Sequence, residues 1–358
     1  MNPKYAPLFQ PFTLNNGVTV KNRLAVAPMT HFGSHADGLI SDQERIFLGN
    51  RAGDMGLFIS AATLVQDGGK AFRGQPEATG EHCLDSLKET AQIIQKQGAK
   101  AILQIHHGGS KAMAELNRRD KISASASEEE GAREASAAEV EELIASFAQA
   151  ADLAIRAGFD GVEIHGANGY LIQQFYSAQS NRRNDKWGGS LENRMRFLLE
   201  TYTAIRAAVG KDFLVGVKLN SADFQKGGFD ESESVQVVQK LSEMGIDFIE
   251  VSGGNYESPQ MLAAKDSTRK REAFFIDYAE KARAVSQAPL IITGGFRSQN
   301  AMEDALSSGH LDLIGVARPF ALVPDLANKM QNGTYQTVQT DRIQTGVALV
   351  DKKAGAML

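Results

Sequence analysis

Three hydrogen-bonding side chains, His165, Asn168 and Tyr170, stand at or just beyond the end of the apolar segment GVEIHG. Polar side chains of this kind are poor choices for a hydrophobic core. Their gathering at one strand end therefore indicates a functional site. The plainer alternative is that His165 and Tyr170 only satisfy backbone carbonyls beneath the following loop.

Lys218 lies near the end of another apolar segment, LVGVKLN. A lysine in that position can act as a Schiff-base nucleophile, as in barrel aldolases. It can also serve as a fixed cation facing an anionic ligand. A third interpretation is a lysine whose stem is buried while its ammonium reaches solvent. The residues alone leave these three open.

A phosphate site is predicted near the C-terminal end of the chain. The segment TGGF supplies the backbone amides of Gly294 and Gly295, and ARP supplies the guanidinium of Arg318. Glycine amides and a forked guanidinium suit a phosphate group. The alternative is a glycine turn beside a surface arginine.

The elements that must position these residues alternate between apolar strands and helical stretches. Continuous apolar strands of this kind are typical of a parallel sheet covered on both faces. The strand candidates end at Met29, Val65, His107, Gly166, Asn220, Gly253, Gly295 and Arg318. Eight such units predict a TIM (β/α)8 barrel, in which the active site lies at the C-terminal ends of the strands.

A hairpin is predicted before the first barrel strand, because two short strand-like runs flank Asn16-Gly17, the preferred pair for a type I′ turn. Residues 1–22 are therefore expected to form a lid on a single domain of residues 1–358. A doubly wound sheet is the rival fold. It would place a G-x-G-x-x-G loop after the first strand, where the sequence has Thr30-His31-Phe32.

Two long connections are expected at the barrel mouth, residues 108–136 and 254–271, because loops of this length are usually functional. The second contains the basic residues Lys265, Arg269, Lys270 and Arg271, which we interpret as a solvated face rather than a nucleotide contact. Ser190 is expected to cap the helix that follows the fourth strand.

Composition excludes several classes of protein. A net charge of -5 argues against nucleic acid or an anionic membrane as the main partner. The single cysteine, Cys83, leaves disulfides, all-cysteine zinc sites and iron–sulfur clusters without ligands. No metal site is expected, since the adjacent His106 and His107 point to opposite faces of a strand. Without a signal pattern or a membrane-length apolar run, we expect a cytoplasmic protein.

Residues 163–197, EIHGANGYLIQQFYSAQSNRRNDKWGGSLENRMRF, closely resemble the signature segment of the Old Yellow Enzyme family. The segments LFQPFTLNNGVTVKNRLAVAPMT, LQIHHGG and TGGF resemble it as well, so the likeness covers nearly the whole chain. These enzymes are FMN-dependent NAD(P)H oxidoreductases, or ene-reductases, built on a TIM barrel. The resemblance implies non-covalent FMN at the strand ends, reduced by NADH or NADPH. A larger branch of the family carries a cysteine-bound iron–sulfur cluster, which is not expected here because the chain has one cysteine.

The resemblance also implies a role for individual residues. Those expected to contact the flavin ring are Pro28, Met29, Thr30, Ala62, Gln104, His165 and Lys218, while Gly294, Gly295, Ala317 and Arg318 would hold its phosphate. His165 and Asn168 match the pair that binds the carbonyl oxygen of the substrate, and Tyr170 matches the proton donor. Phe32 would line the substrate pocket.

The implied reaction is ping-pong reduction of the C=C bond in α,β-unsaturated carbonyl compounds, with hydride passing through flavin N5. Hydrogen bonds from His165 and Asn168 would stabilise the oxygen as it gains negative charge, and Tyr170 would protonate Cα. Two alternatives remain: a Schiff-base aldolase using Lys218, and a non-catalytic barrel that binds flavin or a phosphate ligand. The sequence does not decide whether the chain forms a homo-oligomer.

Three positions depart from the family pattern, one of them Ser110, which stands where many relatives carry an arginine at the mouth. Lys218 stands where an arginine is common beside flavin N1, so the positive charge is kept but the planar fork is lost. Phe32 offers no hydroxyl where some relatives have a tyrosine. The flavin potential and the substrate pocket are therefore expected to differ from those of typical members.

Overall fold

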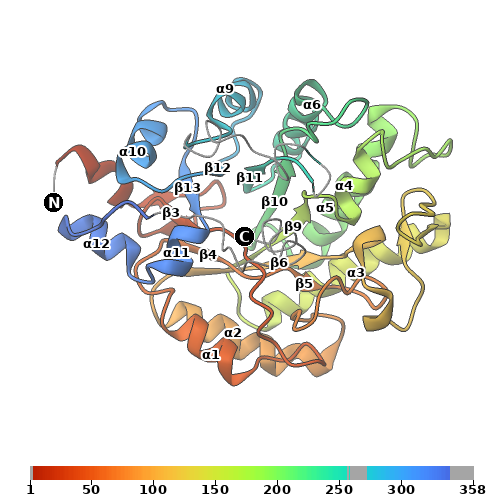
Figure 1. Ribbon diagram of the computed structural model, residues 1–358, viewed down its shortest axis with the longest axis horizontal. Coiled ribbons are helices and arrows are strands. Elements are labelled where there is room, and N and C mark those ends of the chain that lie inside the picture. Colours follow the sequence, from red (N-terminus) through yellow and green to blue (C-terminus); the bar gives the residue numbers. More distant parts are fainter. Residues whose placement is uncertain (1–2, 256–257, 259–271, 339–358) are drawn as a thin grey trace, which may run out of the picture.

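The computed structural model describes residues 3–255, 258 and 272–338 and contains a closed parallel barrel (Figure 1). Strand β4 pairs with both β3 and β6, which closes the sheet, and the short β5 (Thr63–Leu64) extends it beside β6. The barrel strands are β3 (Leu24–Val26), β4 (Leu57–Ile59), β6 (Lys100–His106), β9 (Gly161–Gly166), β10 (Leu214–Asn220), β11 (Phe248–Ser252), β12 (Leu290–Thr293) and β13 (Leu313–Val316). The predicted (β/α)8 barrel is confirmed.

Helices surround the barrel and bury their apolar faces on its outer surface (Figure 1). They are α1 (Asp42–Gly49), α2 (Leu84–Gln95), α3 (Ala137–Arg156), α4 (Leu171–Tyr176), α5 (Leu191–Val209), α6 (Glu231–Glu243), α9 (Ile276–Val285), α10 (Gln299–Ser307), α11 (Arg318–Leu322) and α12 (Leu326–Asn332). Ser190 caps α5 by accepting a hydrogen bond from the N–H of Asn193 at 3.3 Å, as predicted. None of the helices among the described residues is both long and apolar enough to cross a membrane.

The predicted hairpin is present as strands β1 (Phe12–Thr13) and β2 (Thr19–Val20), but its predicted turn type is wrong. A type I′ turn needs positive φ at both central residues. Only Gly17 has it, with φ of 89°. The N–H of Gly17 bonds to the carbonyl of Leu14, and the N–H of Leu14 bonds to that of Val18. This is a three-residue loop, in which glycine takes the left-handed position after a type I turn.

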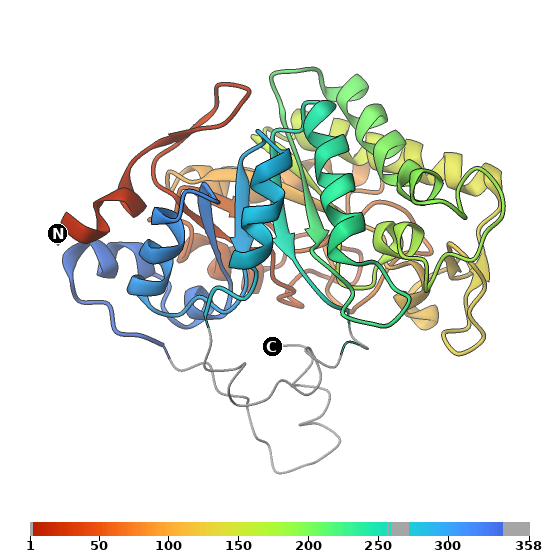
Figure 2. The same cartoon turned by 90° about the horizontal axis from the view of Figure 1, so that it is seen from above.

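The hairpin packs on the amino-terminal end of the barrel. Leu14 and Val20 join a buried cluster of barrel-strand side chains, namely Ala25, Leu57, Ile59, Ile102, Leu214, Phe248, Ile291 and Leu313. Figure 2 shows the hairpin on the side of the barrel away from the ends of β10 and β11. The apolar filling therefore occupies this end of the barrel interior, and the polar side chains lie at the other.

The long connection of residues 108–136 is ordered by short elements of its own. These are η3 (Gly109–Lys111), η4 (Ala114–Leu116), and the paired strands β7 (Ile122–Ser123) and β8 (Arg133–Glu134). The second predicted mouth loop, 254–271, is described only at residues 254, 255 and 258. The basic run 265–271 therefore lies outside the described residues.

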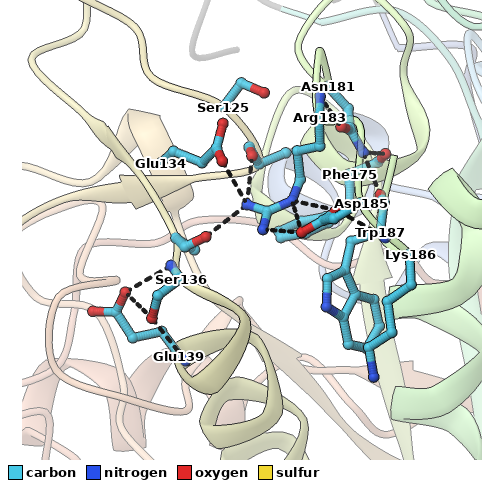
Figure 3. Close-up of polar contacts among 12 residues, drawn as sticks. Ser125, Glu134, Ser136, Glu139, Phe175, Asn181, Arg183, Asp185, Lys186 and Trp187 are labelled. Carbon is cyan, nitrogen blue, oxygen red and sulfur yellow. Dashed lines mark hydrogen bonds and ion pairs between the residues drawn. The ribbon is translucent and has the colours of Figure 1, made fainter. Parts of the chain in front are cut away.

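A buried arginine ties the first mouth loop to the segment before α5 (Figure 3). The guanidinium of Arg183 donates to the carbonyls of Ala124 at 3.0 Å and Ala135 at 2.6 Å, and pairs with Asp185 at 2.6 Å. The Asn181 side chain donates to the carbonyl of Trp187 in the same segment at 2.8 Å. Part of the signature resembling Old Yellow Enzyme therefore serves as a structural brace.

Candidate active site

The strand register brings three site residues side by side. In the parallel ladder Lys218 of β10 is the partner of His165 on β9 and of Glu250 on β11. Gln104 of β6 is the partner of Glu163, two residues before His165. Register partners point to the same face of a sheet, so these side chains all enter the barrel interior near the C-terminal strand ends.

His165 is a buried, neutral hydrogen-bond donor. Its Nδ1 accepts a hydrogen bond from the main-chain N–H of Ala167 at 3.3 Å, which leaves the ring proton on Nε2. Burial lowers the pKa of His165 to about 3, and the positive charge of Lys218 contributes. The imidazole therefore stays uncharged at neutral pH while still carrying an N–H.

Asn168 and Tyr170 follow in a turn between β9 and α4. Asn168 has a left-handed backbone with φ of 60°, a conformation that asparagine tolerates better than most residues. Its main-chain N–H donates to the side-chain oxygen of Asn220 at 3.2 Å, and its carboxamide reaches Ser252 Oγ at 3.5 Å. The Tyr170 ring lies across that of His165, with centroids 5.0 Å apart and planes at 76°.

His106 joins this group, although it was not among the predicted site residues. Its ring is 4.4 Å from Tyr170 and 5.2 Å from His165, centroid to centroid. Gln75 accepts from the N–H of Ala71 through Oε1, so its NH2 group faces His106 Nδ1 at 3.0 Å. The His106 proton is therefore on Nε2, a fully buried atom without a hydrogen-bond partner among the described residues.

Lys218 forms an ion pair inside the barrel. Its Nζ lies 2.7 Å from Glu250 Oε1, and the same oxygen accepts from Thr293 Oγ1 at 2.5 Å. Lys218 is 6% exposed and Glu250 is fully buried. A Schiff base forms from a free amine, whereas this ammonium is held by a carboxylate. The contact favours the fixed-cation interpretation over the nucleophile and over a solvated lysine.

Gln104 is directed by a second buried glutamate. Its Nε2 donates to Glu163 Oε2 at 2.7 Å, so the amide oxygen is the atom left for another partner. Burial raises the pKa of Glu163 well above its usual range, and the negative charge of Glu250 raises it further. Glu163 and Glu250 were not predicted as site residues. The one sequence signal for Glu163 is its place two positions before His165 in an apolar strand, and Glu250 likewise lies within an apolar strand.

The predicted phosphate site lies at the ends of β12 and β13. Gly294 and Gly295 follow β12, with Gly295 at φ of 78°, and Ala317 is the N-cap residue of α11. Removal from solvent lowers the pKa of the Arg318 guanidinium, and the positive charge of nearby Arg297 lowers it further. Two guanidinium groups close enough to repel each other, beside a turn of glycine amides, fit a phosphate anion.

The remaining predicted residues also lie at this end of the barrel. Pro28, Met29 and Thr30 follow β3, the first two partly buried and Thr30 exposed. Ala62 is buried between β4 and β5, and its carbonyl accepts from Gln75 at 3.1 Å. Phe32 has a left-handed φ of 53° and is 49% exposed, with its ring edge-on to Phe72 at 5.5 Å.

Comparison with known proteins identifies the family. A model described as the NADH:flavin oxidoreductase / NADH oxidase family matches residues 7–337. The protein named "Probable NADH-dependent flavin oxidoreductase YqiG" of Bacillus subtilis is 39% identical over 348 residues, which are 95% of this chain and 92% of that protein. The NADH:fumarate oxidoreductase of Klebsiella pneumoniae is 37% identical over 94% of this chain, which spans only 37% of that larger relative.

Comparison with solved structures supports the same family. The Old Yellow Enzyme homologue from Zymomonas mobilis superposes with a TM-score of 0.80 at 26% identity, covering 92% of this chain and 94% of that one. The chain belongs to the NADH:flavin oxidoreductase / NADH oxidase family and is a flavin-dependent oxidoreductase of the Old Yellow Enzyme type. Its electron donor is a nicotinamide nucleotide.

Proposed function

We propose that this enzyme holds FMN non-covalently and reduces the C=C bond of α,β-unsaturated carbonyl compounds with NADH or NADPH. The observation that carries the proposal is the fixed Nε2–H of His165, an uncharged donor at a strand end beside the Tyr170 phenol. Such a pair can bind a carbonyl oxygen and supply a proton to the neighbouring carbon.

The donors on this chain suit an oxygen that becomes negative during the reaction. His165 and the Asn168 carboxamide would both donate to it, and one such donor can contribute about 3 kcal/mol to transition-state stabilisation. Because His165 has a pKa of about 3, it does not compete with Tyr170 for the role of acid at neutral pH. Tyr170 would then deliver its proton to Cα of the bound substrate.

Several residues fit a bound flavin mononucleotide. Gly294, Gly295, Ala317 and Arg318 would hold its phosphate, Gln104 and Lys218 would meet the polar edge of its ring, and Pro28, Met29, Thr30 and Ala62 would lie against it. A bound flavin would supply the hydride chemistry that links oxidation of the nicotinamide nucleotide to reduction of the alkene at Cβ. The phosphate cradle supports FMN over riboflavin.

His165 and Asn168 would also serve the nicotinamide. Its carboxamide oxygen is an acceptor comparable to the carbonyl of the alkene substrate. Both reactants would therefore use the same donors and bind in turn, which gives ping-pong kinetics. The names of similar proteins support NADH as the donor, and Phe32, exposed near the mouth, would contact the substrate.

The first experiment identifies the cofactor and its reductant. Purified protein should be yellow, and denaturation should release FMN, identified by mass spectrometry. Anaerobic stopped-flow mixing with NADH and with NADPH should bleach the flavin, and the ratio of the two rates gives the preference. Protein that is colourless and takes up no added FMN would overturn the proposal.

The second experiment identifies the oxidant. Reduced enzyme should be reoxidised by an enone such as 2-cyclohexenone faster than by buffer alone under argon. Fumarate belongs in the same panel because of the name of the Klebsiella relative, although this chain spans only 37% of that protein. Flavin that is reduced by NADH yet never reoxidised by an unsaturated carbonyl compound would instead favour a binding or electron-donating role.

A further inference from the structure

Glu163 and Glu250 form a pair of carboxyl groups in the barrel interior. Both side chains have 0% exposure. One oxygen of each is already used: Glu163 Oε2 accepts from Gln104, and Glu250 Oε1 accepts from Lys218 and Thr293. The other two, Glu163 Oε1 and Glu250 Oε2, are buried and have no donor among the described residues.

The charges around this pair do not balance if both glutamates are ionised. Lys218 is the only cation in contact with them in the part of the chain described, and it contacts Glu250. His165, the neighbour on the other side of Lys218, is neutral at physiological pH because its pKa is about 3. The carboxyl group of Glu163 is within hydrogen-bonding reach of that of Glu250. Two carboxylates this close would repel strongly, and burying an uncompensated charge is costly.

We propose that Glu163 and Glu250 share one proton, carried on Glu163 Oε1 and donated to Glu250 Oε2. The proton gives each unpaired oxygen a partner and makes the net charge of the group zero. Glu163 keeps Oε2 as a carbonyl-like acceptor for Gln104, and Glu250 remains the counter-ion of Lys218. The direction of the Glu163 pKa, raised by burial and by the charge of Glu250, agrees with this assignment.

The shared proton completes a hydrogen-bonded chain across the barrel, from Gln104 through Glu163 and Glu250 to Lys218. Its two ends are the residues assigned to the polar edge of the flavin ring, so this consequence rests on the proposed function. Glu163 and Glu250 are then positioning residues. Glu163 turns the Gln104 amide so that its oxygen faces the ring, and Glu250 offsets the positive charge of Lys218.

The proton can be detected without flavin. In the apoprotein at neutral pH, the infrared spectrum should contain the C=O stretch of a buried protonated carboxyl that is absent from Glu163→Gln and from Glu250→Gln. Glu250→Gln removes it because Glu163 must then ionise to balance Lys218. Glu303→Gln, at another buried glutamate on α10, is the matched control and should retain the band. A wild-type spectrum identical to that of Glu163→Gln would overturn the proposal.

The holoenzyme gives a second, independent measurement. The glutamine side chain introduced by Glu163→Gln has the shape and charge of a protonated glutamate, with an NH2 group for Glu250 and an oxygen for Gln104. This variant should therefore leave the FMN Kd within about twofold of wild type and the two-electron flavin potential unchanged. If Glu163 is instead ionised, its removal favours the reduced flavin, and each tenfold gain in that preference raises the potential by about 30 mV. A rise of that size would contradict the shared proton.

The two measurements separate this inference from the proposed function. Protein that binds no FMN but shows the carboxyl band would overturn the function and keep the proton pair. Protein that binds FMN and lacks the band would keep the proposed function and overturn the proton pair. If Glu163→Gln fails to fold, Glu250→Gln still tests the shared proton, because the carboxyl band should be lost in that variant as well.

Discussion

The N–H of Ala167 lies 3.3 Å from Nδ1 of His165, two residues earlier in the chain. This contact fixes the ring tautomer from within the β9–α4 turn, without help from a distant residue. The proton remains on Nε2 throughout the normal pH range, because the pKa of His165 is lowered to about 3 by burial and by Lys218.

The donor role of His165 predicts how two substitutions differ. His165→Ala should lower kcat for enone reduction by about 100-fold, the usual effect of losing one oxyanion donor. His165→Asn keeps a donor and should retain more of that rate. Binding of a phenol ligand, followed by the flavin spectrum, should be weaker in His165→Ala than in wild type. In the wild type, this binding should show no titration of His165 between about pH 5 and 8, because its pKa is about 3. A wild-type affinity in His165→Ala would remove this residue from the site.

The proton-donor role of Tyr170 predicts a selective defect. Tyr170→Phe keeps the ring that packs against His106 and His165 and removes only the hydroxyl. Flavin reduction by NADH should change little, whereas reoxidation by an enone should slow by about 100-fold or more, since general acids commonly contribute that much. Stopped-flow kinetics of the two half-reactions measures each separately. An equal loss in both would show that the hydroxyl acts in binding and not in proton transfer.

The sequence predicted the barrel because apolar strands and glycine-ended helices repeat in a pattern that only a few folds accommodate. It located His165 and Lys218 because polar residues at barrel strand ends are rarely structural. It did not predict Glu163, which lies two residues before His165 in β9, or Glu250, which lies beside Lys218 on β11. Their significance depends on strand register, which pairs Lys218 with Glu250 and Gln104 with Glu163 and is not encoded within any one segment.

The same limit explains two other differences. The predicted type I′ turn was wrong because an Asn-Gly pair only favours that turn. In the observed three-residue loop, Gly17 alone has the left-handed conformation. The tautomer of His106 depends on Gln75, 31 residues earlier, and on the N–H of Ala71 that orients its amide. Such long-range hydrogen bonds leave no periodic pattern for sequence reasoning to detect.

Buried His107 predicts a specific dependence of stability on pH. Burial lowers its pKa to about 3, from an unfolded value near 6.5. The unfolded state therefore binds more protons between about pH 6.5 and 3, and wild-type stability should fall as the pH decreases, by about 1.4 kcal/mol per unit for this group. His107→Asn retains an acceptor for the N–H of Gly109 but cannot titrate in this range.

The measurement is the difference in unfolding free energy between wild type and His107→Asn, from urea titrations at several pH values. The difference removes contributions from other titrating groups, provided that they do not couple to this site. Wild type should be more stable at pH 8, because the smaller side chain leaves a cavity, and the gap should narrow by about 2 kcal/mol between pH 6.5 and 5. A gap that does not depend on pH would show that His107 is charged or exposed.

Arg183 predicts a coupling between the signature segment and the mouth loop of residues 108–136. Its guanidinium is buried and supplies partners to the carbonyls of Ala124 and Ala135 as well as to Asp185 (Figure 3). Arg183→Met keeps a similar apolar stem but leaves these carbonyls without a donor, at a cost of about 2–4 kcal/mol in unfolding free energy. The neighbouring Arg182 is exposed, so Arg182→Met should cost less than about 1 kcal/mol despite its own bond to the Ala126 carbonyl.

Limited proteolysis should then cleave within residues 108–136 faster in Arg183→Met than in Arg182→Met, because the brace that holds this loop is lost only in the first. Equal cleavage rates in the two variants would mean that β7 and β8 hold the loop without the arginine, and that the brace serves α5 alone.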